Sequence, residues 1–286
     1  MPSLTKQLTL PVLLTLSLAA STHAQEPGNN PLASLPWQAG PATGQLGDVA
    51  SIVVPEGYRF VDRAGASKFL ELTQNPSHGN ELGVLLSDDG SWFVIFRFSD
   101  DGYVKDDDRK LDADAILSSI RSGTEESNKI RQQRGWATIE VVGWQQKPFY
   151  DSATNNLTWS IRGKSGDEAS INHSTRLLGR RGVMSVNLVL GPDDVGTAVP
   201  AFNKLLTGVS FNPGHRYAEF RQGDKIAEYG LAGLIVGGTG VALVKSGLLQ
   251  KFWKLIVLGF VAVAGAAKRF IAGLFGRREA DAASNV

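Results

Sequence analysis

The chain has 286 residues, a formal net charge of +1 and no cysteine. A charge this close to zero gives no indication of a nucleic-acid partner, and a chain without cysteine forms no disulfide, no thiol site and no lipid-modified cysteine. Once the apolar segments at both ends are set aside, about 200 residues remain, which is enough for one large domain or two small ones with a hydrophobic core.

The first residues have the pattern of an export signal. A basic residue precedes a short apolar run over residues 8–20, and small residues precede Gln25 at the positions that a signal peptidase reads. We therefore predict a signal peptide over residues 1–24 and not a first transmembrane helix, because the run is short and contains proline. The next stretch, residues 25–43, is rich in proline, glycine and asparagine and is predicted to be a flexible arm.

Residues 44–222 are predicted to form an extracytoplasmic α+β domain. Alternating apolar residues and turn residues predict strands, and apolar side chains at helical spacing predict helices. Their order, with connections of hairpin length, favours a mostly antiparallel sheet with packed helices over a doubly wound parallel one. The predicted helices cover residues 64–72, 112–134 and 195–206, and the predicted strands cover residues 51–54, 58–61, 83–86, 92–98, 103–104, 137–144, 157–163, 170–178, 183–190 and 209–211. Strand 92–98 is apolar on both faces and is expected at the centre of the sheet.

A long uncharged run near the C-terminus predicts a transmembrane helix over residues 226–244. A second apolar helix, residues 251–275, is predicted to be membrane-embedded or re-entrant, and residues 276–286 form a basic tail. The lysines and arginines around these segments favour a single crossing with a cytoplasmic tail; the alternative is a helical hairpin that returns outward. We therefore expect the protein in the bacterial inner membrane, with the lipid bilayer as a partner and the main domain in the periplasm.

Gly233 and Gly237 stand four residues apart in the first of these helices. Small residues at this spacing let two helix backbones approach closely, so they predict helix pairing within the chain or between chains. Pairing between chains would make the protein a homo-oligomer.

The predicted sheet has a polar face that suggests an anion site. If the large apolar residues of strand 157–163 face the core, Arg162 faces away from it. Asn172 and Arg176 on the next strand, and Asn187 on the following one, are then expected beside it. Because a guanidinium offers two donors to a carboxylate or phosphate, these residues predict an anion-binding or interaction face. The alternative is the solvated face of a half-buried antiparallel sheet.

A loop between two predicted strands is a second candidate. Tyr150 and Asp151 begin a run of turn-forming residues there. Loops held between strands often carry function, so Tyr150 and Asp151 form a candidate functional loop. The alternative is that the Asp151 side chain closes the turn.

The sequence offers little other chemistry. Carboxylates cluster over residues 100–114, but the EF-hand spacing is absent and basic residues are interspersed, which favours a solvated turn and a helix start over a Ca²⁺ site. His78, His173 and His215 are isolated, which argues against a zinc site, and His173 is expected to be a hydrogen-bonded core histidine. No nucleophile elbow or phosphate-binding glycine loop is present. We therefore predict no metal and no cofactor, and the catalytic residues of any enzyme remain unknown.

Several short motifs, spread over nearly the whole mature chain, resemble one family. They are Pro55-Glu56-Gly57-Tyr58, Asn128, Arg131, Gly135, Val142-Gly143-Trp144, Pro148, Tyr150-Asp151, Leu157, Trp159, the run from Asn172 to Arg176, Leu178-Gly179-Arg180, Gly182 and the C-terminal apolar segments. This set resembles a family of bacterial membrane-anchored proteins of unknown function, the domain-of-unknown-function 2167 family. The resemblance implies an envelope location and membrane anchoring, and it brings no reaction, ligand or catalytic residue.

These observations together favour a non-enzymatic, membrane-anchored protein of the bacterial envelope. Its periplasmic domain is expected to be an interaction or sensing module with a protein partner in the envelope. The alternative is a periplasmic hydrolase of envelope material that uses Asp151 with Arg162 and Arg176. The missing nucleophile motif and the missing metal spacing favour the first interpretation.

Overall fold

The structure is a computed structural model, and it describes residues 31–107 and 109–236. These residues belong to one compact unit, which ends at Val241. The predicted signal peptide, the first part of the predicted arm, the second apolar helix and the basic tail lie outside the described residues.

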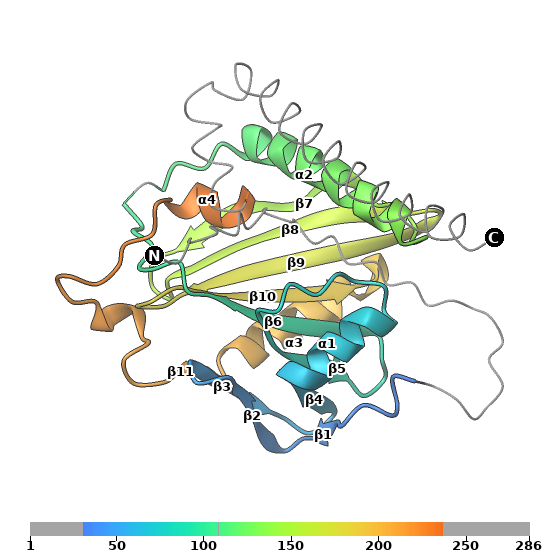
Figure 1. Cartoon of the computed structure of the whole chain (residues 1–286), viewed down its shortest axis with the longest axis horizontal. Coiled ribbons are helices and arrows are strands. Elements are labelled where there is room, and N and C mark those ends of the chain that lie inside the picture. The colour runs from blue at the N-terminus through green and yellow to red at the C-terminus, as the bar shows by residue number, and fades with distance from the viewer. Residues whose placement is uncertain (1–30, 108, 237–286) are drawn as a thin grey trace, which may run out of the picture. The chain divides into compact units, whose positions relative to one another are not determined.

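The domain is built on a large antiparallel sheet (Figure 1). The strand order in this sheet is β1-β4-β5-β6-β10-β9-β8-β7, and a smaller antiparallel sheet has the order β11-β3-β2. The strands of the large sheet are β1 (Gln38–Ala39), β4 (Tyr58–Asp62), β5 (Glu81–Ser87), β6 (Trp92–Ser99), β7 (Glu140–Asp151), β8 (Asn156–Ser165), β9 (Glu168–Leu178) and β10 (Val183–Leu190). Those of the small sheet are β2 (Ala42–Leu46), β3 (Ala50–Val54) and β11 (Val209–Phe211).

Four α-helices accompany these sheets in the described part of the chain. They are α1 (Arg63–Leu72), α2 (Ala113–Gln133), α3 (Val195–Leu206) and α4 (Leu231–Val236), with short 3₁₀ helices at Pro192–Asp194 and Tyr217–Glu219. Aspartates begin the first two: Asp62 accepts from two backbone amides of α1, and Asp112 accepts from one of α2. Such side chains satisfy amides that have no partner inside the helix. Gly123 does not interrupt α2, which is continuous over 21 residues.

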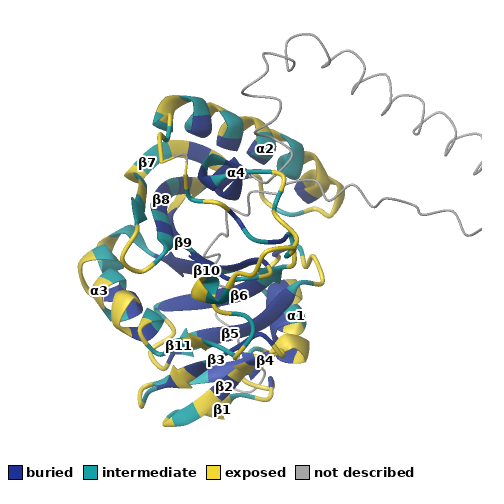
Figure 2. Cartoon of the chain, turned by 90° about the vertical axis from the view of Figure 1, so that its left-hand side faces the viewer, coloured by how far each residue is buried: buried dark blue, intermediate teal, exposed yellow. Residues whose placement is uncertain are grey.

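The large sheet carries hydrophobic clusters on both faces. On one face, here called the α3 face, the small sheet and α3 cover a cluster that includes Phe96, Val186 and Phe202. The other face, here called the α2 face, has two clusters. One lies under α1 and includes Phe69 and Ile95; the other lies under α2 and α4 and includes Trp159. Figure 2 shows β5, β6 and β10 mostly buried between these layers.

The class of fold predicted from the sequence is therefore confirmed as α+β with a large antiparallel sheet. The predicted strand 92–98 is β6, a central strand whose apolar residues are buried on both faces, as expected. The predicted strand 103–104 is wrong: Tyr103 forms only an isolated bridge to Ile226. The hairpin turn before β6 has Gly90 at a positive φ of 72°, which a glycine adopts at low cost.

The second half of the predicted flexible arm is part of the domain. Leu35 is buried, the Trp37 ring packs edge-on against Phe69 at 6.0 Å between centroids, and β1 pairs with β4. The prediction of an arm over residues 25–43 is wrong for these residues. Two apolar side chains fill the edge of the cluster under α1, and the burial outweighs a composition rich in turn formers.

The segment around the start of the predicted membrane helix is tied to the domain. Arg180 forms a two-pronged ion pair with Asp224, with both N–O distances at 2.7 Å, and the Tyr229 hydroxyl donates to Asp101. Together with the bridge at Ile226, these contacts hold the chain against the loop after β6. Arg–carboxylate pairs of this geometry are strong when partly shielded from water.

The described part of the predicted helix 226–244 differs from that prediction. The helix α4 begins at Leu231 and not at Ile226, and its side chains are buried in the cluster under α2. In the part of the chain that the structure describes, no helix is both long enough and apolar enough to span a membrane. Residues 237–244 lie outside the described residues, so the membrane helix stays a prediction.

Candidate functional site

A row of polar side chains crosses the α2 face between its two hydrophobic clusters. The strand register pairs Glu81 with Arg97, Arg97 with Ser185, and Ser185 with Arg176. Directly paired residues of antiparallel strands point to the same face, so these side chains stand side by side on β5, β6, β10 and β9. We call Glu81, Arg97, Ser185 and Arg176 the polar row.

One end of the polar row is a buried ion pair. The Nε of Arg97 lies 3.1 Å from Oε1 of Glu81, and both side chains are less than a tenth exposed. Glu81 also accepts hydrogen bonds from the Ser77 hydroxyl and from the backbone amides of His78 and Gly79. Burial alone would raise the pKa of Glu81, but the His78 amide and the charge of Arg97 outweigh it, so the pKa is lowered. Glu81 is therefore a carboxylate.

The other end of the row is a guanidinium without a carboxylate. Arg176 donates from Nη1 to Oδ1 of Asn187 at 3.0 Å, and its guanidinium carbon lies 4.7 Å from the centre of the Trp159 ring. Among the described residues, no carboxylate forms an ion pair with Arg176. Part of this residue reaches the surface, but burial of its guanidinium and the nearby charge of Arg97 lower its pKa to about 9.

The polar row has more positive charge and more donors than its own acceptors satisfy. Two guanidinium groups face one carboxylate, which leaves one positive charge. The Nη2 of Arg97 is buried and has no hydrogen-bond partner among the described residues. A buried charged donor without a partner is costly and rare in native proteins, so it marks a place where a ligand can supply an acceptor.

The predicted anion-binding face contains residues that lie on opposite sides of the sheet. Asn172, Arg176 and Asn187 all belong to the α2 face, where Asn187 contacts Arg176 directly. Arg162 pairs with Ile171 and points to the α3 face, where it donates to Gln145 at 2.9 Å. The predicted grouping of Arg162 with Arg176 is therefore wrong. The register places Leu157, and not Arg162, beside Arg176.

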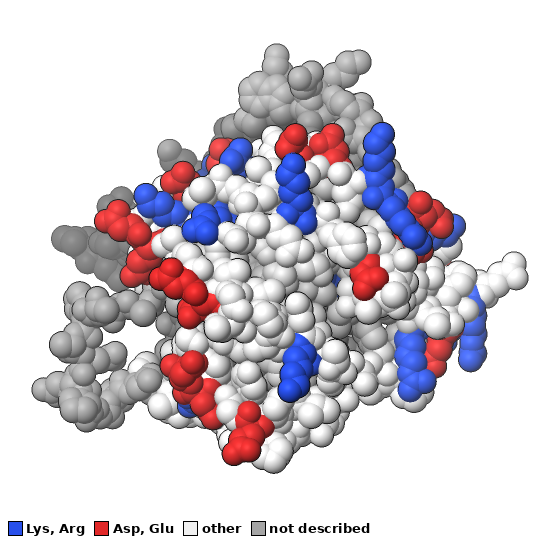
Figure 3. All heavy atoms as spheres, turned by 180° about the vertical axis from the view of Figure 1, so that it is seen from behind, with Lys and Arg blue, Asp and Glu red and all other residues white. Residues whose placement is uncertain are grey.

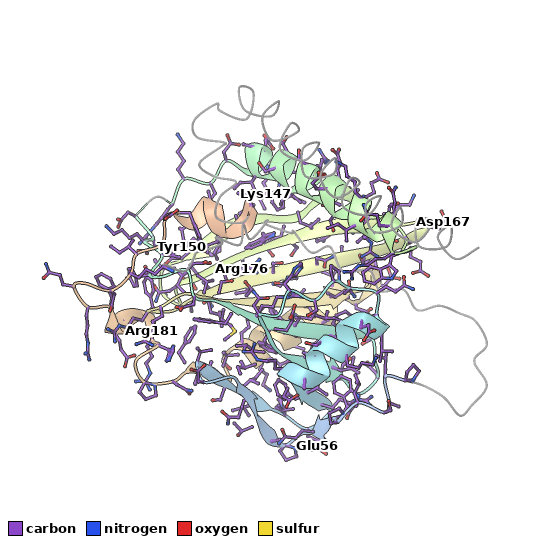
Figure 4. All side chains as sticks on the ribbon, viewed as in Figure 1. Glu56, Lys147, Tyr150, Asp167, Arg176 and Arg181 are labelled. Atoms are coloured by element: carbon purple, nitrogen blue, oxygen red, sulfur yellow. The ribbon has the colours of Figure 1, made fainter. Side chains whose placement is uncertain are left out.

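The two residues of the candidate loop have different places in the structure: Asp151 closes a turn, and Tyr150 lies on the α2 face. Asp151 accepts from the amide of Ala153 at 2.9 Å and from the hydroxyl of Thr154 at 2.8 Å, so its carboxylate closes the turn. Tyr150 pairs with Leu157, which itself pairs with Arg176, so Tyr150 continues the line of the polar row. Its hydroxyl donates to Asp106 at 3.0 Å. Figure 4 labels Tyr150 and Arg176 toward the same end of the sheet.

A second buried polar group lies on the α3 face. The Ser160 hydroxyl and Nδ1 of His173 are 2.6 Å apart, and the His173 ring packs edge-on against Phe202. Burial lowers the pKa of His173 to about 4, so the ring is neutral near neutral pH. Its Nε2 is buried without a hydrogen-bond partner among the described residues, so no carboxylate orients the ring as in a catalytic triad. The prediction of a hydrogen-bonded core histidine is confirmed.

Two open hollows on the surface of the described residues contain no residue of the polar row. One, of about 440 Å³, lies between α2 and β7 and is lined by residues such as Arg121 and Asn128; the other, of about 300 Å³, lies beside Asp88 and Trp92. On the face shown in Figure 3, acidic and basic side chains are interspersed. No cluster of histidine or acidic residues among the described residues has the arrangement of a metal site.

Sequence reasoning missed Glu81 and Arg97. The signal for Arg97 is its position, because it is the only charged residue in the otherwise apolar strand 92–98. A charged residue at the centre of a buried strand requires a partner. The sequence does not say which carboxylate provides it.

The fold and the polar row define an α+β domain with a buried, charged cluster in its large sheet. The chain belongs to the family described as "Protein of unknown function (DUF2167)", whose model matches residues 38–267. The resemblance seen in the sequence is thereby confirmed.

The solved structures that are similar to this chain include the following two. The solution structure of cyanobacterial PsbP (CyanoP) from Synechocystis sp. PCC 6803 is 13% identical with a TM-score of 0.38, over 62% of this chain and 92% of that one. The crystal structure of LpqN from Mycobacterium tuberculosis, described as involved in cell envelope biogenesis, is 11% identical with a TM-score of 0.31, over 64% of this chain and 95% of that one. Both TM-scores are too low to carry an argument about function. No curated protein matches the chain.

Proposed function

We propose that this chain is a membrane-anchored protein of the bacterial envelope whose periplasmic domain is an interaction or sensing module. The observation that carries the proposal is the polar row, a buried cluster with a positive charge in excess and an unpartnered Arg97 donor. Such a cluster suits recognition, since a guanidinium binds oxyanions and has no role as a nucleophile. The signal-peptide pattern and the uncharged C-terminal run support the location in the inner membrane.

The alternative, a periplasmic hydrolase, receives less support. Asp151 closes a turn, Arg162 lies on the α3 face and Arg176 on the α2 face, so these three side chains do not form one site. The close Ser160–His173 pair is buried in the core under α3. A nucleophile must reach its substrate, and this hydroxyl does not reach the surface.

The experiment that tests the proposal is crosslinking in intact cells, followed by identification of what co-purifies with the full chain. A recurrent envelope protein or ligand is expected for an interaction or sensing module. The matched variants are Arg176→Gln in the polar row and Arg162→Gln on the opposite face of the same sheet. Loss of the crosslinked species in the first variant alone supports the proposal. Equal recovery from both variants and the wild type would place the interaction elsewhere, and a trapped, chemically altered substrate would favour the hydrolase.

Membrane topology forms the second part of the proposal. We propose one crossing over residues 226–244, a shallow or re-entrant second helix and a cytoplasmic tail. A fluorescent protein that folds only in the cytoplasm, fused after Val286, should then be fluorescent. An active exported phosphatase at the same position would instead support the hairpin that returns to the periplasm.

We propose that Gly233 serves packing within the chain and not a contact between chains. A Cβ at Gly233 would lie 2.7 Å from the Cβ of Tyr229, so this glycine allows α4 to pack against its own preceding residues. Gly237 lies outside the described residues, and a homo-oligomer contact through both glycines is the alternative. Gly233→Ile should lower the thermal stability of the full chain in detergent without changing its oligomeric state. A lost crosslinked dimer would support the homo-oligomer.

A further inference from the structure

We propose that the polar row binds an oxyanion group with a single negative charge, namely a carboxylate or a phosphodiester, between Arg97 and Arg176. The inference rests on the proposed function and deepens it, because it names the chemical class of ligand that the domain recognises. It follows from the donors, the charge and the exposure of the row.

The donors for such a group stand on adjacent strands. Arg97 and Arg176 flank Ser185, because each pairs with it directly across β10. Neighbouring strands lie about 4.8 Å apart, so the backbones of the two arginines are separated by about 10 Å. Both side chains point to the α2 face, and each is long enough to reach over Ser185. A group with two acceptor oxygens then bridges them, with the Ser185 hydroxyl as a third donor.

The two arginines have unequal roles in the row. Arg97 is committed through Nε to Glu81, but its Nη2 is buried without a hydrogen-bond partner among the described residues. Arg176 is fixed by Asn187 on one side and by the Trp159 ring on the other, so its planar fork is held in place before a ligand arrives. Holding donors in place in advance reduces the entropy that binding removes.

The charge of the row selects a monoanion. The Glu81 carboxylate already neutralises one of the two guanidinium groups, so one positive charge remains. A group with one negative charge balances it, whereas a phosphate dianion would leave an excess negative charge beside Glu81. Unbalanced charge is expensive in a low-dielectric setting, so the dianion is disfavoured.

The residues of the row are less buried toward its Arg176 end. Glu81 and Arg97 are buried, whereas Ser185 and Arg176 are partly exposed. An anion therefore approaches from the Arg176 side and reaches Arg97 last. Truncation of Arg176 therefore removes one of the two charged donors without disturbing the Glu81–Arg97 pair.

The test is thermal unfolding of the full chain in detergent, with added sodium acetate, sodium dimethyl phosphate, inorganic phosphate at a pH where it is a dianion, and sodium chloride at equal ionic strength. Acetate or dimethyl phosphate should raise the melting temperature in a saturable way, because a ligand that binds only the folded state stabilises it. The stronger of the two identifies a free carboxylate or a lipid-like phosphodiester as the source of the group. Chloride should give no saturable effect.

Variants locate the effect. Arg176→Gln should raise the dissociation constant of the monoanion at least about tenfold, since it removes a charged donor that contacts the ligand. Arg162→Gln, on the opposite face of the same sheet, is the matched control and should leave the constant unchanged. Glu81→Gln adds one net positive charge to the row and should shift the preference toward inorganic phosphate.

Three results would overturn the proposal: equal responses to all salts, an unchanged constant in Arg176→Gln, or the same loss in Arg162→Gln. If Arg176→Gln does not fold, the wild type decides, since saturable stabilisation by a monoanion but not by chloride or phosphate dianion is required. The crosslinking experiment is independent of these titrations. A recurrent partner without any anion effect would refute the ligand class and leave the interaction module in place.

Discussion

The two faces of the large sheet handle buried polar groups in different ways. On the α3 face, Ser160 and His173 form a neutral pair inside a hydrophobic cluster. On the α2 face of the same sheet, the polar row contains three charged groups between two clusters. The comparison shows that one sheet carries a polar group that burial makes neutral and another that burial cannot neutralise.

The difference comes from the acid–base chemistry of the side chains. A histidine in an apolar site loses its proton at ordinary pH and then carries no charge that needs a counter-ion. An arginine keeps its proton under nearly all conditions, so it needs an anion wherever it is buried. In the polar row, one carboxylate stands against two arginines and forms an ion pair with Arg97 only. The Ser160–His173 pair on the α3 face therefore has no unbalanced charge, whereas the polar row on the α2 face has a place for a negative charge.

The largest effect is expected when the buried ion pair is broken. Arg97→Leu leaves the Glu81 carboxylate buried without its cation, and the free energy of unfolding should fall by about 3–5 kcal/mol. Urea unfolding of the full chain measures the loss. The double variant Glu81→Gln/Arg97→Leu should lose less, because no uncompensated charge remains. A double variant that is less stable than Arg97→Leu would contradict this account of the pair.

The neutral Ser160–His173 pair should make the free energy of unfolding depend on pH. The pKa of His173 is about 4 in the folded state and 6.5 in its ordinary state, so the unfolded chain takes up the proton first as the pH falls. Stability contributed by the neutral ring is thus present above about pH 6.5 and is lost progressively toward about pH 4. Between about pH 7 and about pH 5 the loss from this residue should be about 2 kcal/mol.

His173→Gln should flatten that part of the profile of stability against pH, measured by urea unfolding at each pH. Burial also lowers the pKa of His78, which contributes with the same sign and remains in the variant. His78→Gln is therefore the control that separates the two residues. An unchanged slope in His173→Gln would show that this ring is not protonated on unfolding.

A smaller effect is expected at the acceptor that holds Arg176. Asn187→Ala removes the hydrogen bond to its guanidinium, and the free energy of unfolding should fall by about 1–2 kcal/mol because a charged donor loses its partner. Thr158→Val removes a neutral hydroxyl contact to Thr175 on the α3 face and should cost less. Acetate at a saturating concentration should stabilise Asn187→Ala by more than Thr158→Val, because only the first variant leaves an Arg176 donor without an acceptor. Equal stabilisation of both variants would contradict this role of Asn187.

The smallest effect is expected at Arg162, whose contact on the α3 face is exposed to solvent. Arg162→Gln should change the free energy of unfolding by less than about 0.5 kcal/mol, because its contact to Gln145 is exposed to solvent. Thermal unfolding of the full chain is sufficient to check it. A large loss would show that Arg162 has a buried role that its exposed contact does not indicate.

The sequence alone determined the position of most elements and the bounds of three of them. Helix 195–206 and strands 183–190 and 209–211 have the predicted bounds, because alternation, helical spacing and an aspartate before the helix are local signals. The class of fold follows from the same local patterns, whereas the family follows from the resemblance of the short motifs. The two-sided apolar pattern of strand 92–98 also fixed its central position, since only a covered strand tolerates apolar residues on both faces.

Only the tertiary structure decided which polar residues meet. Alternation fixes which residues of one strand share a face, but the register between strands is set by backbone pairing and packing, and a shift of one residue reverses every face. For this reason the sequence grouped Arg162 with Arg176, whereas the register joins Arg176 to Arg97 through Ser185. The same holds for α4, whose apolar residues suit a membrane or a protein core equally well. In the structure, residues 231–236 are buried under α2.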